Sequence, residues 1–390
     1  SWYQELAIAK MEDGISAEEY SRRINSVNCF ERQLTDDGYL IIKLFLHISK
    51  GEQKRRFIKL KDDDETKWRV TELDKKRHKH YDEYYEAFDD MLVKTNSPHA
   101  PWKIIETTDK AYTKFQMFNI LVSQITNALN VERTAAPVVD DFPLVPMPKL
   151  SEVVLEGKTV PRAKYDDMLK KKQKELARLH SRLYQAKIPL IIAFEGWDAA
   201  GKGGNIKRIA SALDPRGYEA VPISAPDKAE LNHHYLWRFW NDLPKTGHIV
   251  IFDRTWYGRV MVEKIEGFTS PERCAQAYTE INEFERELTD SGAVVLKFWL
   301  QIDKDEQLKR FNERQNTPEK QWKITDEDWR NREKWDQYEV CVNEMLHRTS
   351  TVNAPWYVIE ADDKLYARLK TMDIIIDTVN KRLKDDKKKK

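Results

Sequence analysis

The chain has 390 residues, of which 41% are hydrophobic and 11% aromatic, a content that supports two domains with hydrophobic cores and excludes a disordered protein. Its 66 basic and 65 acidic residues nearly cancel, so the overall charge indicates no nucleic-acid partner, and an anion-binding surface must come from local sorting of charge. Cys29, Cys274 and Cys341 lie far apart, which excludes a zinc-ligand spacing and favours a reducing cytoplasm. No apolar run is long enough to cross a membrane, so we expect a cytoplasmic protein with no membrane partner.

Two regions of the chain repeat each other. Residues 2–129 align with residues 256–383 at a constant offset of 254 residues, without a gap. About a third of the aligned positions are identical, where chance would give roughly one in sixteen. Phe30-Glu31-Arg32 matches Phe284-Glu285-Arg286, for example, and Ala100-Pro101-Trp102 matches Ala354-Pro355-Trp356. The sequence therefore contains a tandem duplication.

The first copy, residues 1–130, contains only two predicted strands, 40–48 and 102–106. It begins at Trp2, which aligns with Trp256, so it lacks counterparts of the three strands that precede Trp256 in the second copy. About 90 further residues would be needed to complete this domain, because two strands cannot bury both of their faces. We expect a partial, non-catalytic copy that is unstable alone, followed by a proline-rich, extended linker at 131–160.

The second copy, residues 161–390, alternates helices and strands. A helix is predicted at 161–186, and the predicted strands are 188–195, 219–224, 248–253, 294–302 and 356–360. This alternation predicts an α/β fold, a parallel five-stranded sheet with helices on both faces. The first of these strands is followed by a glycine-rich loop, which makes the expected fold that of a P-loop kinase.

The loop Gly196-Trp197-Asp198-Ala199-Ala200-Gly201-Lys202 lies between the first strand and a helical sequence. A G-x-x-x-x-G-K loop in this setting turns backbone N–H groups toward a phosphate, with the helix N-terminus behind it and the lysine as a positive charge. Gly203 stands where the usual motif has a hydroxyl ligand for Mg²⁺, and Asp198 is the nearest carboxylate that could replace it. The residues predicted to bind phosphate here are Gly196, Ala199, Ala200, Gly201, Lys202, Gly203 and Gly204.

Asp253 ends an apolar strand, a position from which a carboxylate orients Mg²⁺ in P-loop enzymes, although it could instead cap the next helix. Arg254 and Arg259 follow it, and both could neutralise charge on a transferring phosphoryl group. A surface salt bridge is the alternative for Arg259. Further cations that could extend the anion-binding track along or after the P-loop helix are Lys207, Arg208 and Arg216.

Residues 305–340 are rich in basic and aromatic side chains, among them Arg314, Lys323 and three tryptophans, Trp322, Trp329 and Trp335. In P-loop kinases the segment at this place is a mobile helical lid, which closes over the phosphates and excludes water. Acidic residues are interleaved, so a solvated helix face is the alternative. The tryptophans either stack on a base or belong to the core.

The duplication allows the two copies to be compared position by position. Shared residues such as Tyr3 and Arg56 are expected to be architectural. The first copy, however, has Glu5 opposite Arg259 and Leu60 opposite Arg314. Loss or reversal of charge at these two positions indicates that Arg259 and Arg314 serve chemistry in the second copy and that the first copy is not catalytic.

Three motifs together resemble the polyphosphate kinase 2 family: residues 196–204 (GWDAAGKGG), 252–257 (FDRTWY) and 318–323 (PEKQWK). Two fused copies resemble the polyphosphate:AMP phosphotransferase branch of that family, which makes ADP from AMP with polyphosphate and Mg²⁺. The resemblance implies that Asp198 and Asp253 bind the metal and that Asp198 also activates the acceptor phosphate. It implies phosphate binding by Lys202, and phosphate binding and charge stabilisation by Arg254 and Arg314.

The sequence therefore predicts transfer of a terminal phosphoryl group from inorganic polyphosphate to AMP by a Mg²⁺-dependent homo-oligomer. One alternative is an ATP-dependent nucleoside monophosphate kinase, because residues 253–257 (DRTWY) also resemble a motif of thymidylate kinases. A second alternative is a non-catalytic polyphosphate-binding scaffold. The choice between AMP and ADP as the acceptor stays open.

Overall fold

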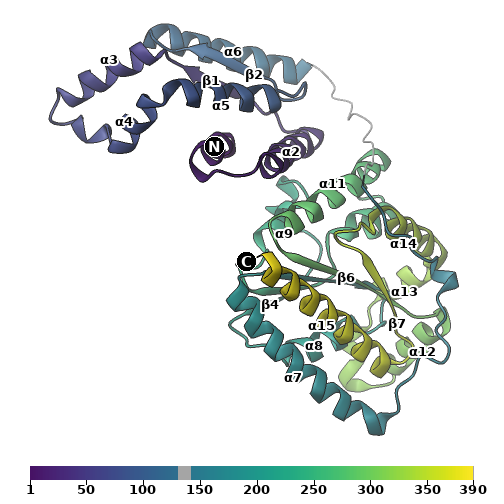
Figure 1. Cartoon of the computed structure of the whole chain (residues 1–390). Coiled ribbons are helices and arrows are strands. Elements are labelled where there is room, and N and C mark those ends of the chain that lie inside the picture. Colours follow the sequence, from purple (N-terminus) through teal and green to yellow (C-terminus); the bar gives the residue numbers. More distant parts are fainter. Residues whose placement is uncertain (131–141, 390) are drawn as a thin grey trace. The chain divides into compact units, whose positions relative to one another are not determined.

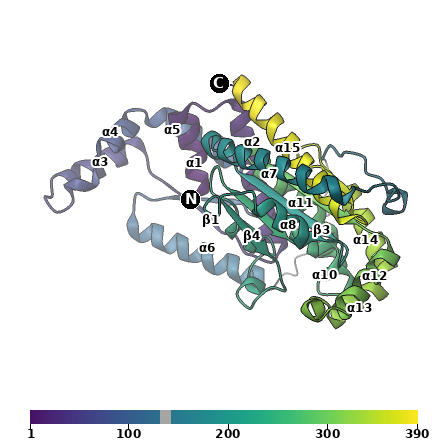
Figure 2. The same ribbon diagram turned by 90° about the horizontal axis from the view of Figure 1, so that it is seen from below.

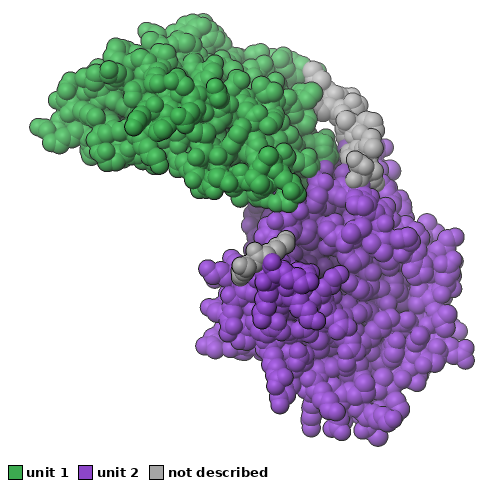
Figure 3. All heavy atoms as spheres, viewed as in Figure 1, with its two compact units in different colours: residues 1–136 green, residues 137–390 purple. Residues whose placement is uncertain are grey.

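The computed structural model describes residues 1–130 and 142–389, and the chain divides into two compact units, residues 1–136 and 137–390 (Figure 3). Of the predicted linker, residues 131–141 lie outside the described residues. The remainder, from residue 142 to 160, belongs to unit 2 and is extended apart from a short 3-10 turn, η3 (Leu150–Glu152), and a turn at residues 156–157. Its backbone is held there: the N–H of Leu150 donates to Oδ1 of Asn343 at 2.8 Å, and the N–H of Val160 donates to Oδ2 of Asp363 at 2.9 Å.

Unit 2 is built on a five-stranded parallel sheet, as the sequence predicts (Figure 1). The strand order is β4-β5-β3-β6-β7, and the bounds are β3 (Leu190–Gly196), β4 (Tyr218–Pro222), β5 (Ile249–Asp253), β6 (Val294–Gln301) and β7 (Trp356–Glu360). The central strands β3, β5 and β6 are mostly apolar and are buried over nearly their whole length because both of their faces are covered by helices. Their carboxyl ends meet at one edge of the sheet.

Two groups of helices cover this sheet (Figures 1 and 2). The helix α15 (Lys364–Lys389) packs on α7 (Arg162–Ala186), α8 (Lys202–Ala210), β6 and β7, whereas α11 (Pro271–Asp290) packs on β6, α14 (Trp335–Thr349) and η5 (Trp256–Val260). The lid segment consists of α12 (Lys304–Gln315), η6 (Pro318–Lys323) and α13 (Asp326–Glu333). The remaining short elements are η4 (Glu230–Asn232), α9 (Trp237–Asn241) and α10 (Val262–Ile265).

Unit 1 contains the two parallel strands that the sequence predicts, β1 (Lys43–His47) and β2 (Trp102–Glu106). Helices surround them in the same order as in the second half of unit 2. They are α1 (Trp2–Ile8), η1 (Ala9–Asp13), α2 (Ala17–Asp36), α3 (Lys50–Lys61), η2 (Lys67–Arg69), α4 (Glu72–Lys79), α5 (Tyr81–Lys94) and α6 (Lys110–Asn130). In the described parts of the chain, no helix combines the length and the apolarity that crossing a membrane requires.

The two units contain the same buried ion pair, which reflects the duplication. In unit 2, the Nζ of Lys297 lies 2.7 Å from Oε2 of Glu285 and donates to the hydroxyl of Tyr257 at 2.8 Å. In unit 1, the Nζ of Lys43 lies 2.8 Å from Oε2 of Glu31. Burial makes each charge costly unless its partner is present, so this pair fixes how the strand packs on the helix in each copy. Residues that the two copies share here are architectural rather than catalytic.

Candidate active site

The loop that follows β3 has a backbone that only some residues allow. Gly196 has φ of 151°, and a Cβ atom there would lie 2.7 Å from the carbonyl oxygen of Leu300 in β6, so the close approach of the two strands requires glycine. Gly201 at φ of 110° and Ala199 at φ of 64° turn the chain into the N-terminus of α8. A left-handed alanine is strained and is tolerated only where its surroundings hold it in place.

The loop and the lid enclose a cleft of about 870 Å³. Ten basic side chains line it against five acidic ones, although the chain as a whole is almost balanced in charge. The predicted site residues that the structure brings together here are Asp198, Ala199, Ala200, Gly201, Lys202, Gly203, Gly204, Lys207, Arg208, Asp253, Arg254, Arg314 and Lys323. Local sorting of charge has therefore produced a site suited to a large anion.

Three predicted phosphate-binding residues do not line this cleft. Gly196 lines an adjacent pocket. The side chain of Arg216 is 90% exposed, and its Nη2 lies 2.8 Å from Oδ2 of Asp214. Nη1 of Arg259 lies 2.9 Å from Oε2 of Glu263. This ion pair corresponds to the salt bridge that the sequence left open as the alternative role of Arg259.

Lys202 begins α8 and lies back across the loop, where its Nζ donates to the carbonyl of Gly196 at 2.7 Å. Arg314, in the last turn of α12, donates from Nη1 to the carbonyl of Lys323 at 2.9 Å, and burial lowers its pKa. The ammonium of Lys202 thus lies on the floor of the cleft, while Arg314 is held on its lid side.

Two aspartates lie near the carboxyl ends of the neighbouring strands β3 and β5. Asp253 is the last residue of β5, and the alternative role as a helix cap is filled by Thr255, whose hydroxyl accepts the N–H of Tyr257 at 3.3 Å. Asp198 projects from the loop, where its Oδ1 lies 3.5 Å from Nη2 of Arg254. Both carboxylates line the same cleft.

Arg254 has φ of 66°, a second strained residue at the edge of the cleft. Its N–H donates to the carbonyl of Phe194 in β3 at 3.1 Å, which fixes the turn after β5 against the central strand. Burial alone would lower the pKa of the guanidinium, but the carboxylates of Asp198 and Glu195 raise it above its usual value. Arg254 is therefore a permanent positive charge directed into the site.

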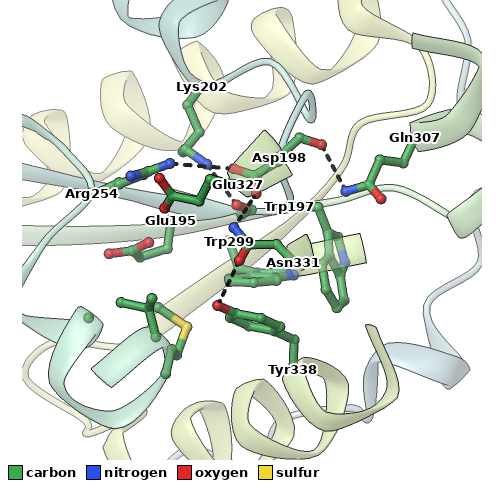
Figure 4. A pocket seen from close by; sticks show the side chains of 14 residues that line it. Glu195, Trp197, Asp198, Lys202, Arg254, Trp299, Gln307, Glu327, Asn331 and Tyr338 are labelled. Atoms are coloured by element: carbon green, nitrogen blue, oxygen red, sulfur yellow. Dashed lines mark hydrogen bonds and ion pairs between the residues drawn. The ribbon is translucent and has the colours of Figure 1, made fainter. Parts of the chain in front are cut away.

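A smaller pocket adjoins the cleft and shares the loop with it (Figure 4). Figure 4 shows the rings of Trp197, Trp299 and Tyr338 around this pocket, with Glu195 and Arg254 on its opposite side. Its wall thus combines aromatic rings with charged and amide groups, which is the usual composition of a site for a small polar molecule with an apolar part.

The lid and α14 contribute polar groups to this pocket. Nδ2 of Asn331 donates to Oδ2 of Asp198 at 3.0 Å, and the hydroxyl of Tyr338 donates to Oδ1 of Asn331 at 3.3 Å. On the sheet side, Glu195 is buried and accepts a hydrogen bond from the hydroxyl of Thr255 at 2.7 Å. Burial raises the pKa of Glu195 to about 7.

The three tryptophans of residues 305–340 differ in their environment. Trp335 is buried and stacks parallel on Trp197, with ring centroids 3.6 Å apart. Trp329 packs edge-on against Phe311. Trp322 is 75% exposed and lines the cleft. Of the two roles expected for these rings, packing therefore accounts for Trp335 and Trp329, and Trp322 remains available to a ligand.

Several residues of the site were not among the sequence candidates. Lys364 and Arg368 lie one turn apart at the start of α15 and line the cleft, because that helix begins at the carboxyl end of β7. The only signal for these two residues in the sequence is that they follow a predicted strand. Glu327, Asn331 and Tyr338 have no motif, and only the fold brings them to the loop, whereas Glu195 directly precedes the loop in the sequence.

A strand, a glycine-rich loop, a helix and a basic cleft in this arrangement are typical of enzymes that transfer phosphoryl groups. The family model described as polyphosphate kinase 2 matches residues 1–133 and 159–387. The chain belongs to the polyphosphate kinase 2 family.

Relatives of known name span the whole chain. A polyphosphate:AMP phosphotransferase of Pseudomonas aeruginosa is 41% identical over 390 residues, which cover 99% of this chain and 79% of that protein. One of Acinetobacter johnsonii is 38% identical over 394 residues, covering 99% and 78%. The crystal structure of a polyphosphate kinase 2 from Pseudomonas aeruginosa PA01 matches with a TM-score of 0.84 at 39% identity, covering 98% of this chain and 77% of that one.

Proposed function

We propose that this protein transfers the terminal phosphoryl group of inorganic polyphosphate to AMP and so forms ADP. The full-span relatives named polyphosphate:AMP phosphotransferase support this reaction. The observation that carries it is the excess of ten basic over five acidic side chains in the cleft. A single triphosphate would not need cations on α8, α15 and the lid together, whereas a long polyanion would.

The donor chain would lie along this cleft, with a phosphate against the backbone N–H groups of the loop and the N-terminus of α8. Lys202, Arg254 and Arg314 would then surround the transferring group and stabilise the charge that spreads over its oxygens in the transition state. AMP would place its phosphate at Asp198 and Arg254 and its base toward the aromatic wall of the adjacent pocket. The two reacting groups would be held in line across the loop.

Mg²⁺ fits the residues present. Asp198 and Asp253 offer hard carboxylate oxygens from the ends of the neighbouring strands β3 and β5, and Gly203 supplies no competing hydroxyl. Asp253 ends β5 and lines the cleft, where a cation can reach its carboxylate. When bound, the ion would screen the negative charge of the phosphates.

Catalysis would belong to unit 2, and unit 1 would be non-catalytic. Leu60 stands in unit 1 where unit 2 has Arg314, so the charge on the lid side is absent there. We propose further that the chain divides into a partial copy at 1–130, a linker at 131–160 and a catalytic domain at 161–390. We also propose a cytoplasmic location and a homo-oligomeric state. The described thiols of Cys29, Cys274 and Cys341 form no disulfide, as a reducing compartment requires.

The test is product analysis by anion-exchange chromatography with AMP and polyphosphate in the absence of ATP. We expect ADP from the wild-type chain and none from Lys202→Ala. Lys171→Ala, which removes an exposed lysine of α7, is the matched control and should retain full activity. ADP formation that requires ATP would instead identify a nucleoside monophosphate kinase, and polyphosphate binding without turnover would identify a scaffold.

A further inference from the structure

The lid helix α12 holds the backbone of the phosphate-binding loop. Nε2 of Gln307 donates to the carbonyl of Asp198 at 3.1 Å. Nη1 of Arg310 donates to the carbonyls of Ala199 and Ala200 at 3.0 and 3.1 Å. Both side chains are 2% exposed. Three consecutive loop carbonyls are therefore bound from α12.

Arg310 uses its remaining donors on other parts of unit 2. Its Nη2 donates to the carbonyls of Ala361 and Asp362 at 2.7 and 2.8 Å, at the junction between β7 and α15. Its Nε donates to Oε1 of Glu306 at 2.7 Å. All five N–H groups of the guanidinium thus bind the protein itself, and none is left for a phosphate. Arg310 therefore has no hydrogen-bond donor of its own for a phosphate, and it contributes its charge to the cleft and its hold on the loop.

Unit 1 contains the counterpart of Arg310, and this residue makes part of the same set of hydrogen bonds. In unit 1, Arg56 repeats two parts of the arrangement: its Nε donates to Glu52 at 2.7 Å, and its Nη2 donates to the carbonyls of Thr107 and Thr108 after β2. These bonds correspond one by one to those that Arg310 makes to Glu306, Ala361 and Asp362. The bonds from Nη1 to the loop carbonyls have no counterpart among the described residues of unit 1.

Gln307 shows the same difference. Its counterpart Gln53 interacts with Nδ1 of His78 at 2.6 Å, within unit 1. The bonds that both copies make are therefore architectural, and the bonds to the loop carbonyls are described in unit 2.

We propose that Gln307 and Arg310 are positioning residues that set the phosphate-binding conformation of the loop from the lid helix. Bonding the carbonyls of residues 198–200 to α12 turns the N–H groups of the loop toward the cleft and holds Ala199 in its left-handed conformation. The same helix carries Arg314 one turn further on. The loop and the lid arginine are thus oriented by one rigid element, and a shift of α12 changes both together.

This inference rests on the proposed function for its kinetic test, so a binding test is paired with it. The variants are Gln307→Met, which removes one donor to the loop and keeps the side-chain length, and Arg310→Lys. The matched controls are Gln53→Met and Arg56→Lys in unit 1, made in the full chain. For each protein we would measure kcat and KM for AMP, the melting temperature, and the Kd for inorganic tripolyphosphate by calorimetry.

We expect Gln307→Met to lower kcat at least about tenfold with KM for AMP within about twofold, since misplaced groups slow the reaction more than they weaken binding. Its Kd for tripolyphosphate should rise about tenfold, and its melting temperature should change no more than that of Gln53→Met. Arg310→Lys should show a larger kinetic loss than Arg56→Lys. If Arg310→Lys does not fold, the comparison of Gln307→Met with Gln53→Met decides whether the side chains of α12 position the loop.

A Gln307→Met variant with the wild-type kcat and the wild-type Kd for tripolyphosphate would overturn the inference. An equal loss in Gln307→Met and Gln53→Met would also overturn it, because the effect would then be general destabilisation. Failure of the proposed function has a different signature: the wild-type chain would form no ADP, while the tripolyphosphate measurements would still separate Gln307→Met from its control.

Discussion

Replacement of Arg314 by leucine installs the residue that unit 1 has at the same position, Leu60. The substitution removes one of the ten cations of the cleft and the hydrogen bond from Nη1 to the carbonyl of Lys323. A single hydrogen bond of this kind contributes about 1 kcal/mol to stability, so the melting temperature should fall by only about 2–4 °C. Arginines that face a transferring phosphoryl group contribute far more to the rate, by factors of about 10³ or higher.

We therefore expect Arg314→Leu to lower kcat at least about tenfold, which corresponds to a loss of about 1.4 kcal/mol of transition-state stabilisation or more. The assay is initial-rate ADP formation from AMP and polyphosphate, with melting followed by circular dichroism. Arg330→Leu is the control, because Arg330 is an exposed arginine of α13 and is not among the residues that line the cleft. Kinetics of Arg314→Leu that match those of Arg330→Leu would refute the role given to Arg314.

Three further predictions concern carboxylates and the buried ion pair. Asp198→Asn and Asp253→Asn should each abolish the activity that Mg²⁺ supports, measured as ADP formed over a Mg²⁺ titration; a near-native rate would remove that residue from the metal site. Lys297→Met should destabilise the protein by about 3–5 kcal/mol in chemical denaturation, because it leaves the carboxylate of Glu285 buried without its partner; a loss under 1 kcal/mol would contradict the architectural role of the pair. Burial raises the pKa of Glu195 to about 7, above its value in the unfolded chain, so its contribution to stability is lost as the pH rises toward 7 and beyond. Glu195→Gln should then be more stable than the wild type at pH 8, by a margin that shrinks toward pH 5, and a margin independent of pH would exclude this effect.

The parts of the fold that followed from the sequence are those specified by local patterns. The runs that became β3, β5 and β6 are apolar without alternation, which occurs when a strand is buried on both faces, and the structure confirms them within two residues of the predicted bounds. The constant offset between the copies made the shared elements predictable in pairs, among them the two strands of unit 1.

The site was predictable only where a motif or a strand end marks a residue. The loop residues and Asp253 meet in one cleft because the carboxyl ends of parallel strands lie at one edge of the sheet. Arg216 is close to the loop in sequence, yet it pairs with Asp214 and lies outside the cleft. Arg368 is far from the loop in sequence, yet it lines the cleft beside Gly204.

The sequence by itself determined the duplication, the parallel sheet of unit 2 and the phosphate-binding loop, because each of these depends on residues that are neighbours in the chain or are repeated at a fixed offset. The tertiary structure alone decided which cations share the cleft and what each shared residue does. Arg56 and Arg310 stand at equivalent positions of the repeat and both bind the end of a strand, and in the described part of the chain it is Arg310 whose Nη1 donates to a glycine-rich loop. Contacts between distant segments depend on how the elements pack, and that packing is not encoded in the local pattern of either segment.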